Sequence, residues 1–275
     1  MQKTFLAKVA TLGMALVCPF TMGFAAKETE EQGYCANFRG AGVPTEYSET
    51  ITYDHKETTT VEFEYGIPYY HLISFGNICA NMAGGVIIGY YDRFAEDLIP
   101  NFKSYSQLGS YIHYKGNSYE ANDMIEKLYD YMGTNIGQDG TDFDGFNSGM
   151  AAYAATYGGY TYTQTNVWGS NLTAYKNAIA AEKPVAVFAT GFSLLSSLTE
   201  GNGVDTLGIM EYDGDKHVMV GYGYRIDNYY DSSNKLIETR TYLIVYNGGM
   251  INSSIKYLQL DGRTNVDHAI AVTIS

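Results

Sequence analysis

The sequence predicts an α+β protein in which a helical lobe is followed by an antiparallel β lobe. Two observations predict this class. An apolar run that starts just after Asn77, and three later segments with helical spacing, place the helices at about residues 75–182. Short apolar and β-branched runs separated by turn residues follow at about residues 183–275. This change of character suggests two lobes with a cleft between them, in one domain over residues 51–275.

The first 26 residues have the features of a secretory signal peptide. Two lysines precede a mostly apolar run at residues 9–20, and small residues stand just before position 27. The run is too short and too interrupted to span a bilayer. A lipoprotein signal would need a small residue before Cys18, where Val17 stands instead. We therefore predict a signal peptide at residues 1–26 and a secreted protein, and we assign residues 27–50 to a mobile lead or short pro-segment.

Each later element has its own local signal. β-Branched and aromatic residues at 49–65 predict one or two strands. Three glycines in the first helix, Gly84, Gly85 and Gly89, weaken its helix propensity and predict that its backbone packs closely against another element. The predicted helices cover residues 79–94, 121–131, 144–157 (closed by Gly158 and Gly159) and 171–181. The predicted strands after the first helix cover residues 160–167, 184–188, 218–224, 241–246, 255–260 and 269–274.

The charge balance and the cysteine count narrow the possible partners. The chain has 30 Asp plus Glu against 17 Lys plus Arg. Nucleic acid and anionic lipid both attract basic patches, so we expect neither nucleic acid nor a membrane as a partner. Three cysteines become two after signal cleavage, and a chain of this size needs no disulfide to fold. Because a disulfide would prevent Cys79 from acting as a nucleophile, we expect Cys35 and Cys79 to be free thiols.

Cys79 is the candidate nucleophile. Asn77 is a good N-cap residue, and Cys79 would then lie in the first helical turn. Unpaired N–H groups and the helix dipole favour an anion there, and the thiolate is the form of cysteine that attacks a carbonyl carbon. The alternative is a structural cysteine, since free cysteine is among the most buried residue types.

His217 and Asn247 are the candidate base and orienting residue. His217 opens a predicted strand behind a polar turn, which would keep its ring near water, and Asn247 ends the next strand. If these strands form a hairpin, Asn247 returns beside His217, where an amide carbonyl could fix the imidazole tautomer. His217 follows Cys79 by about 138 residues, within the range of about 130–150 in papain-type chains. The alternatives are a partly buried structural histidine and a simple Asn-Gly-Gly turn.

Three blocks of sequence together resemble the papain-like cysteine peptidases, most nearly the bacterial C39-like group and more loosely streptopain. They are Asn77-Ile78-Cys79-Ala80 with the helix after it, Lys216-His217-Val218-Met219-Val220-Gly221-Tyr222, and Tyr242-Leu243-Ile244-Val245-Tyr246-Asn247-Gly248-Gly249. The resemblance covers about residue 65 to the C-terminus. It implies a papain-like two-lobed fold with Cys79 as nucleophile, His217 as base and Asn247 as the residue that orients the ring.

The chain departs from the pattern of that family at two places. Ala80 and Asn81 follow the cysteine, where papain has Gly-Ser/Ala-Cys and an aromatic residue. Ile73 occupies the place of the glutamine that such enzymes carry before the cysteine. The oxyanion hole would then use the backbone N–H of Cys79 and a side chain for which Asn77 is the nearest candidate. Loss of one oxyanion donor typically lowers the rate about 100- to 1,000-fold.

These observations predict a secreted cysteine peptidase that hydrolyses peptide bonds in a peptide or protein substrate through a thioester acyl-enzyme. The chemistry needs no metal and no organic cofactor. The same three residues could serve an amidase or a transpeptidase. The non-enzyme alternative is a catalytically degenerate papain-like fold that acts as a secreted binding module.

Three other polar features compete for a role. His268 also starts a predicted strand, but no later Asn or Asp could orient it. His71 precedes the nucleophile and could line the cleft or end a loop. Asp139, Asp142 and Asp144 do not have the alternate-residue spacing of a calcium-binding EF-hand loop, so we interpret them as a solvated turn before a helix.

Overall fold

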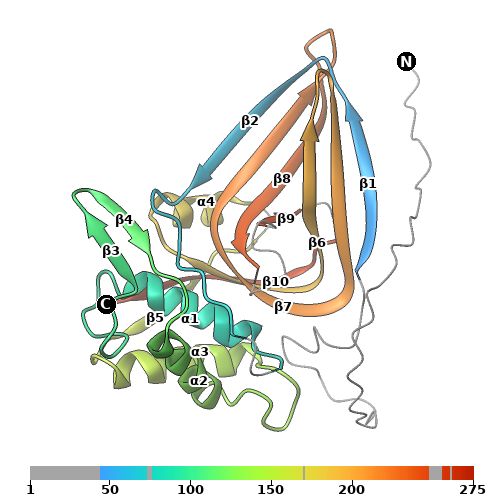
Figure 1. Ribbon diagram of the computed structural model, residues 1–275. Helices are drawn as coiled ribbons and strands as arrows, with labels where there is room; N and C mark the ends of the chain where they lie inside the picture. Colours follow the sequence, from blue (N-terminus) through green and yellow to red (C-terminus); the bar gives the residue numbers. More distant parts are fainter. Residues whose placement is uncertain (1–43, 73–75, 170, 248–255, 261) are drawn as a thin grey trace.

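The protein is a mixture of helices and antiparallel sheet (Figure 1). The computed structural model describes residues 44–72, 76–169, 171–247, 256–260 and 262–275. The helices are α1 (Cys79–Tyr91), α2 (Tyr119–Tyr131), α3 (Phe143–Thr156) and α4 (Thr173–Ala180). The strands are β1 (Thr45–Thr52), β2 (His55–Glu62), β3 (Tyr105–Leu108), β4 (Tyr111–Tyr114), β5 (Tyr162–Asn166), β6 (Val185–Glu200), β7 (Val204–Tyr230), β8 (Leu236–Tyr246), β9 (Tyr257–Gln259) and β10 (Val266–Ile274).

The large sheet is organised around β7, a strand of 27 residues. Its order is β1-β7-β8-β9-β6-β10-β5, with β2 also paired to β7 and a further β6–β7 pairing. The first part of β7 pairs with β1 and β6, and its second part pairs with β2 and β8. All of these pairings are antiparallel. The β6–β7 ladder shifts register between Thr190 and Phe192, where Gly191 has a φ of 66°.

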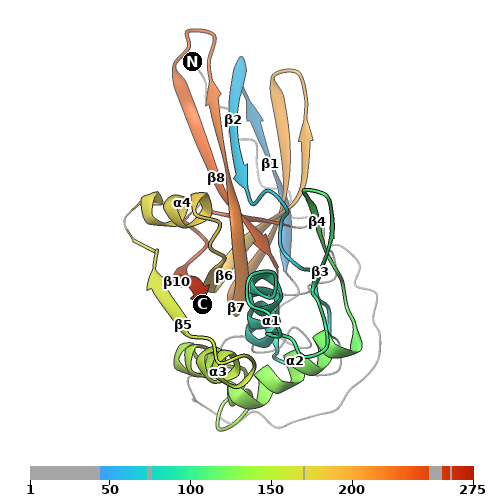
Figure 2. The same ribbon diagram turned by 90° about the vertical axis from the view of Figure 1, so that its left-hand side faces the viewer.

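The helices α1, α2 and α3 gather at one end of the molecule, and the long strands extend away from them (Figures 1 and 2). Every residue of α1 is buried. A Cβ added at Gly84 would lie 2.8 Å from Cε of Met132, and one added at Gly85 would lie 2.8 Å from Cγ1 of Ile125. The glycines therefore let the α1 backbone approach α2 closely, which confirms the packing expected from the sequence.

The far ends of the long strands enclose a second, smaller core. It is built from Ile51, Leu195, Leu207, Ile209, Tyr229 and Tyr242, which come from β1, β6, β7 and β8. Beside it, the buried carboxylate of Asp205 accepts hydrogen bonds from Lys56 Nζ at 2.7 Å and from Tyr229 Oη at 3.1 Å. Burying a carboxylate is costly unless it is paired, so this network allows a charge to lie beside a small apolar core.

The four predicted helices are present with ends close to those expected. The strands differ more. β6 and β7 run far beyond residues 184–188 and 218–224, and the β3–β4 hairpin was not predicted at all. Residues 45–50, assigned to a mobile lead from the sequence, form most of β1 and pair with β7. The predicted signal peptide at residues 1–26 lies outside the described residues.

The described helices include none with the length and apolar character needed to cross a bilayer.

Candidate functional site

Cys79 is the first residue of α1, and its sulfur lies against the start of the apolar half of β7. The backbone N–H of Val218 donates a hydrogen bond to Cys79 Sγ at 3.1 Å. The sulfur of Cys79 is therefore hydrogen-bonded to the residue that follows His217 in β7. The side chain is almost fully enclosed, with Cys79 4% exposed and His217 1% exposed.

The contact between β7 and β8 brings His217 to Asn247. The two strands pair with Val220 opposite Tyr246, so the chain beyond β8 returns to the level of His217. His217 Nε2 lies 2.8 Å from the main-chain carbonyl oxygen of Asn247. Since a carbonyl oxygen only accepts, Nε2 of the neutral ring carries the proton and the basic lone pair is on Nδ1. The ring thus contacts the backbone carbonyl of Asn247, and not the side-chain amide carbonyl expected from the sequence.

The environment of His217 is apolar. Its ring stacks on Phe192 with centroids 5.5 Å apart, and Phe192 in turn stacks on Tyr212 at 4.8 Å. Burial lowers the pKa of His217 to about 4, although the Asn247 carbonyl acts in the opposite direction. At neutral pH the imidazole is therefore uncharged and able to accept a proton.

The expectation that His217 opens a strand and stays near water was wrong. Residues 213–216, interpreted from the sequence as a polar turn, lie inside β7. His217 is in the middle of that strand, opposite Ala189 of β6. Lys216 and Tyr212 pair with Thr190 and Phe192 of β6, and residues 213–215 lie opposite the register shift between these two pairs, so the ladder on both sides continues the strand through polar residues that favour a turn in isolation.

The expectation of a free thiol at Cys79 was also wrong, because Cys79 is disulfide-bonded. The other two cysteines of the chain, Cys18 and Cys35, lie outside the described residues. Spacing could not reveal this pairing, because whether two cysteines meet depends on how the chain folds back on itself. In this state the sulfur is protected from reaction with a substrate.

Asn77 does not cap α1. The N-cap residue is Ile78, without a side-chain hydrogen bond, and Asn77 itself has a φ of 60°. The Asn77 side-chain amide donates instead to Oδ1 of Asn135 at 3.2 Å. Asparagine tolerates the left-handed conformation, and this backbone turn places the side chain away from the first turn of the helix. Ile73, noted at the place of the family's glutamine, lies outside the described residues.

A polar cluster that was not expected from the sequence supports the loop before Cys79. Asn135 Nδ2 donates to the carbonyl of Gly76 at 3.3 Å, and Asn135 Oδ1 accepts from the N–H of Gly140 at 2.7 Å. Asn81, fully buried within α1, donates to Thr134 Oγ1 at 2.9 Å. The signal for this cluster was an asparagine inside an apolar helix, because a buried amide requires hydrogen-bond partners.

The competing polar features lie elsewhere. His268 is exposed and stacks on Phe143, with ring centroids 4.2 Å apart. The main chain of His71 is held by the side chain of Asn117 through two hydrogen bonds. Asp142 is the N-cap of α3, where it accepts from the N–H of Gly145 at 2.6 Å, which confirms the interpretation of the acidic turn.

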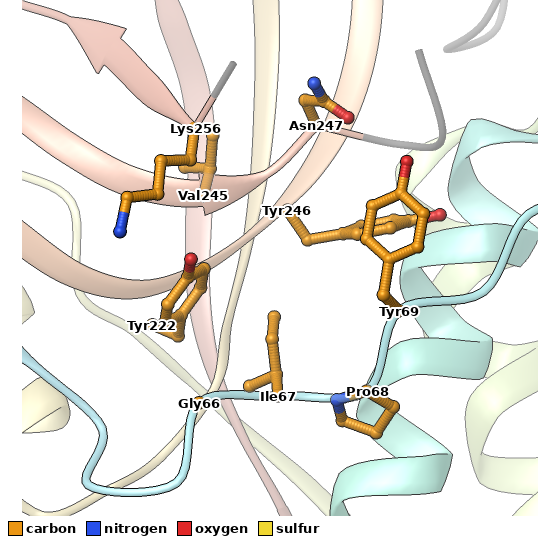
Figure 3. A pocket seen from close by; sticks show the side chains of 9 residues that line it. All are labelled: Gly66, Ile67, Pro68, Tyr69, Tyr222, Val245, Tyr246, Asn247 and Lys256. Carbon is orange, nitrogen blue, oxygen red and sulfur yellow. The ribbon is translucent and has the colours of Figure 1, made fainter. Parts of the chain in front are cut away.

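A small pocket adjoins the site at Asn247 (Figure 3). Its volume is about 140 Å³. Among the described residues, its lining consists of Gly66, Ile67, Pro68, Tyr69, Tyr222, Val245, Tyr246, Asn247 and Lys256. Figure 3 shows the segment 66–69 on one side of the space and the end of β8 on the other.

Within the described part of the chain, no group of three or more His, Cys, Asp or Glu side chains is placed to hold a metal ion. No family model matches the chain, and neither the curated proteins nor the solved structures contain a match.

Proposed function

We propose that this chain is a cysteine peptidase that becomes competent when the disulfide at Cys79 is reduced. The observation that carries the proposal is the pair of contacts at one place on β7. Val218 N–H meets the sulfur of Cys79, and the neighbouring His217 ring meets Asn247. Cys79 and Asn247 thus contact two adjacent residues of β7, which supports the assignment of a nucleophile, a base and an orienting group to Cys79, His217 and Asn247. The papain-like fold belongs to the same proposal.

In the proposed reaction, the reduced Cys79 gives its proton to Nδ1 of His217 and its sulfur attacks the carbonyl carbon of the substrate. The N–H of Val218 stabilises negative charge on the sulfur. His217 then returns the proton to the leaving amine, which leaves a thioester on Cys79, and water hydrolyses the thioester. The Asn247 carbonyl holds Nε2–H throughout, so the basic nitrogen stays on the other side of the ring.

The low pKa of His217 defines which state of the pair the site favours. A buried imidazole of pKa about 4 is uncharged at neutral pH, so the reduced pair rests as a thiol and a neutral imidazole, and His217 raises the rate as a general base during attack by the sulfur. Proton transfer therefore accompanies attack on the substrate, and we expect activity to persist at mildly acidic pH, where His217 is still neutral.

A second candidate function is supported by the disulfide itself. If the bond at Cys79 is permanent, the chain is a secreted binding module that keeps a papain-like framework without its chemistry. Both functions assume export, which rests on the predicted signal peptide at residues 1–26. N-terminal sequencing of the protein recovered outside the cell tests that assumption, and a mature terminus near residue 27 supports it.

The decisive experiment compares thiol reactivity before and after reduction. The full mature chain is treated with iodoacetamide at neutral pH, with and without prior dithiothreitol, and the modified residue is located by mass spectrometry. The peptidase proposal expects selective labelling of Cys79 only after reduction, at a rate above that of a free thiol. The variant His217→Gln should lose the enhanced rate, and His113→Gln, which changes an exposed histidine, should keep it.

A peptide-library digest of the reduced protein then separates peptide hydrolysis from the amidase and transpeptidase alternatives. Labelling of reduced Cys79 no faster than that of a free thiol, with no cleavage of any peptide, would leave the binding module as the better description.

A further inference from the structure

We infer that the pocket beside Asn247 binds an apolar side chain of the substrate, on the amine side of the bond that is cut. The inference rests on the proposed peptidase function and adds the substrate class that this site selects. It is carried by the lining of the pocket, by its size and by its position relative to His217.

The lining is predominantly apolar and aromatic. Ile67, Pro68 and Val245 contribute aliphatic surface, and Tyr222 and Tyr246 contribute rings. The cation at the rim, Lys256, is paired with Glu62, with Nζ 3.4 Å from Oε2. Its charge is therefore already neutralised nearby, and it does not impose an anionic ligand on the pocket.

The walls are held in place by contacts with one another and with residues outside the pocket. Tyr246 Oη donates to the carbonyl of Tyr70 at 2.6 Å, and the Tyr246 ring meets Tyr69 edge-on with centroids 5.2 Å apart. Tyr222 packs edge-on against Phe63, with centroids 6.4 Å apart. A pocket whose side chains are fixed in advance loses little entropy when a ligand enters.

The volume matches a single side chain. A dry cavity of about 150 Å³ in another protein accommodates benzene, and this pocket has about 140 Å³. A phenyl ring or a leucine side chain is therefore the right size, whereas an alanine methyl would leave most of the space unfilled.

The position of the pocket assigns it to the amine side. Asn247 lines the pocket and also binds Nε2 of His217. In the proposed reaction Nδ1 of His217 returns its proton to the leaving amine, so the residues that follow the scissile bond lie beside the His217 ring, whose opposite edge contacts Asn247. The residue that contributes the amine thus has its side chain nearest the pocket.

The first test measures cleavage of peptides that differ only at that residue. We expect kcat/KM of the reduced protein to be about 10-fold or more higher for Phe or Leu than for Ala or Asp at this position. The variant Ile67→Trp fills the pocket from a half-buried loop position and should reduce this preference to about 2-fold. Leu108→Trp, which changes an exposed residue in the β3–β4 hairpin, should leave the preference unchanged.

The second test does not depend on catalysis. The variant Cys79→Ser cannot form the disulfide or the thioester acyl-enzyme. Ligand-observed NMR measures how tightly this variant binds two dipeptide amides, Phe-Gly and Ala-Gly, each with a free amine. Binding of Phe-Gly that is tighter than binding of Ala-Gly supports the pocket even if no peptide is cleaved. This difference should disappear in the double variant that carries Cys79→Ser and Ile67→Trp. Equal binding of both dipeptides overturns the inference, and fast labelling of reduced Cys79 would still support the peptidase.

Discussion

Nε2 of His217 lies 2.8 Å from the main-chain carbonyl oxygen of Asn247, a residue 30 positions later in the chain. The β7–β8 pairing produces this contact without any help from the Asn247 side chain. It fixes the proton of the neutral ring on Nε2 and directs the basic lone pair of Nδ1 to the other side. The orientation of the His217 ring therefore depends on the hairpin, and less on the identity of the residue at position 247.

This relationship predicts that Asn247→Ala retains most of the reactivity of reduced Cys79. Since the carbonyl belongs to the backbone, replacing the side chain keeps the acceptor of the hydrogen bond. We expect the iodoacetamide rate to fall by less than about 10-fold, against a loss of about 100-fold or more for His217→Gln. A loss in Asn247→Ala as large as in His217→Gln would show that the amide side chain orients the ring.

The depressed pKa of His217 predicts a pH-dependent stability. An unfolded histidine titrates near 6.5, and folded His217 titrates at about 4, so between these values the unfolded state binds more protons. The contribution of His217 to stability is complete above pH 6.5 and is lost as the pH falls toward 4. Between pH 7 and pH 5 the free energy of unfolding should fall by about 2 kcal/mol from this group.

Urea unfolding at the two pH values measures this loss. The variant His217→Gln should lack this component of the decrease, while His113→Gln, an exposed histidine of β4, should show the same decrease as the unchanged protein. Equal decreases in all three proteins would mean that His217 is not buried as a neutral ring.

The sequence predicted the elements whose signals are local. The α1 helix was visible because its apolar run is longer than a strand, and the pairing of β7 with β8 was visible because two apolar strands flank a turn. That pairing was sufficient to place Asn247 near His217. The approach of Cys79 to His217 was expected only from the family resemblance, and the contact of its sulfur with the N–H of Val218 was not predicted.

Features that depend on partners distant in sequence were not predicted. Residues 201–217 are rich in Gly and Asp, which favour turns, yet residues 204–211 extend β7 between β1 and β6, and Lys216 and His217 pair with β6. The burial of His217 depends on Phe192 in β6, and the disulfide at Cys79 depends on a cysteine outside the described residues. Neither relation has a signature in local composition.

The disulfide predicts that replacing the cysteine bonded to Cys79 makes Cys79 reactive without a reductant. If the predicted signal peptide at residues 1–26 is removed together with Cys18, Cys35 is the one cysteine of the sequence left to pair with Cys79. In the mature chain, Cys35→Ser should therefore be labelled at Cys79 by iodoacetamide in the absence of dithiothreitol, to the extent seen after reduction of the unchanged chain. The disulfide should also stabilise the fold, so Cys35→Ser should lower the free energy of unfolding by about 2–4 kcal/mol.

Ser48→Ala, a substitution in β1 that leaves every cysteine in place, is the control and should remain unlabelled without dithiothreitol. If the Cys35→Ser variant stays unlabelled at Cys79 until dithiothreitol is added, Cys35 is not the residue bonded to Cys79.

The α2–α3 contact predicts a sensitive glycine. A Cβ at Gly149 would lie 2.8 Å from the backbone N of Met132 and 2.9 Å from its Cα, and backbone atoms cannot move aside as a flexible side chain can. Alanine gains about 1 kcal/mol in helix propensity, but the overlap costs about 1–3 kcal/mol and forces α3 away from α2. We expect Gly149→Ala to lower the melting temperature, and Gly169→Ala, where a Cβ has no neighbour within 4 Å, to leave it nearly unchanged.

The loop before Cys79 provides the last prediction. Asn135 binds this loop through the carbonyl of Gly76 and the side chain of Asn77, so we expect it to position Cys79, the proposed nucleophile. Asn135 has a φ of 60°, a conformation that glycine adopts without strain. The variant Asn135→Gly therefore removes the hydrogen bonds and keeps the backbone, which separates the two effects.

We expect Asn135→Gly to lower the labelling rate of reduced Cys79 by about 10-fold, because displacement of a reacting atom by a fraction of an ångström is costly. The free energy of unfolding should fall by only about 1 kcal/mol. Asn234→Gly is the matched control, since Asn234 has a φ of 63° in the turn between β7 and β8, outside this loop. A positioning role requires the rate to fall in Asn135→Gly alone, with a pH profile of labelling that keeps its shape. Equal rates in both variants would show that the loop holds Cys79 without Asn135.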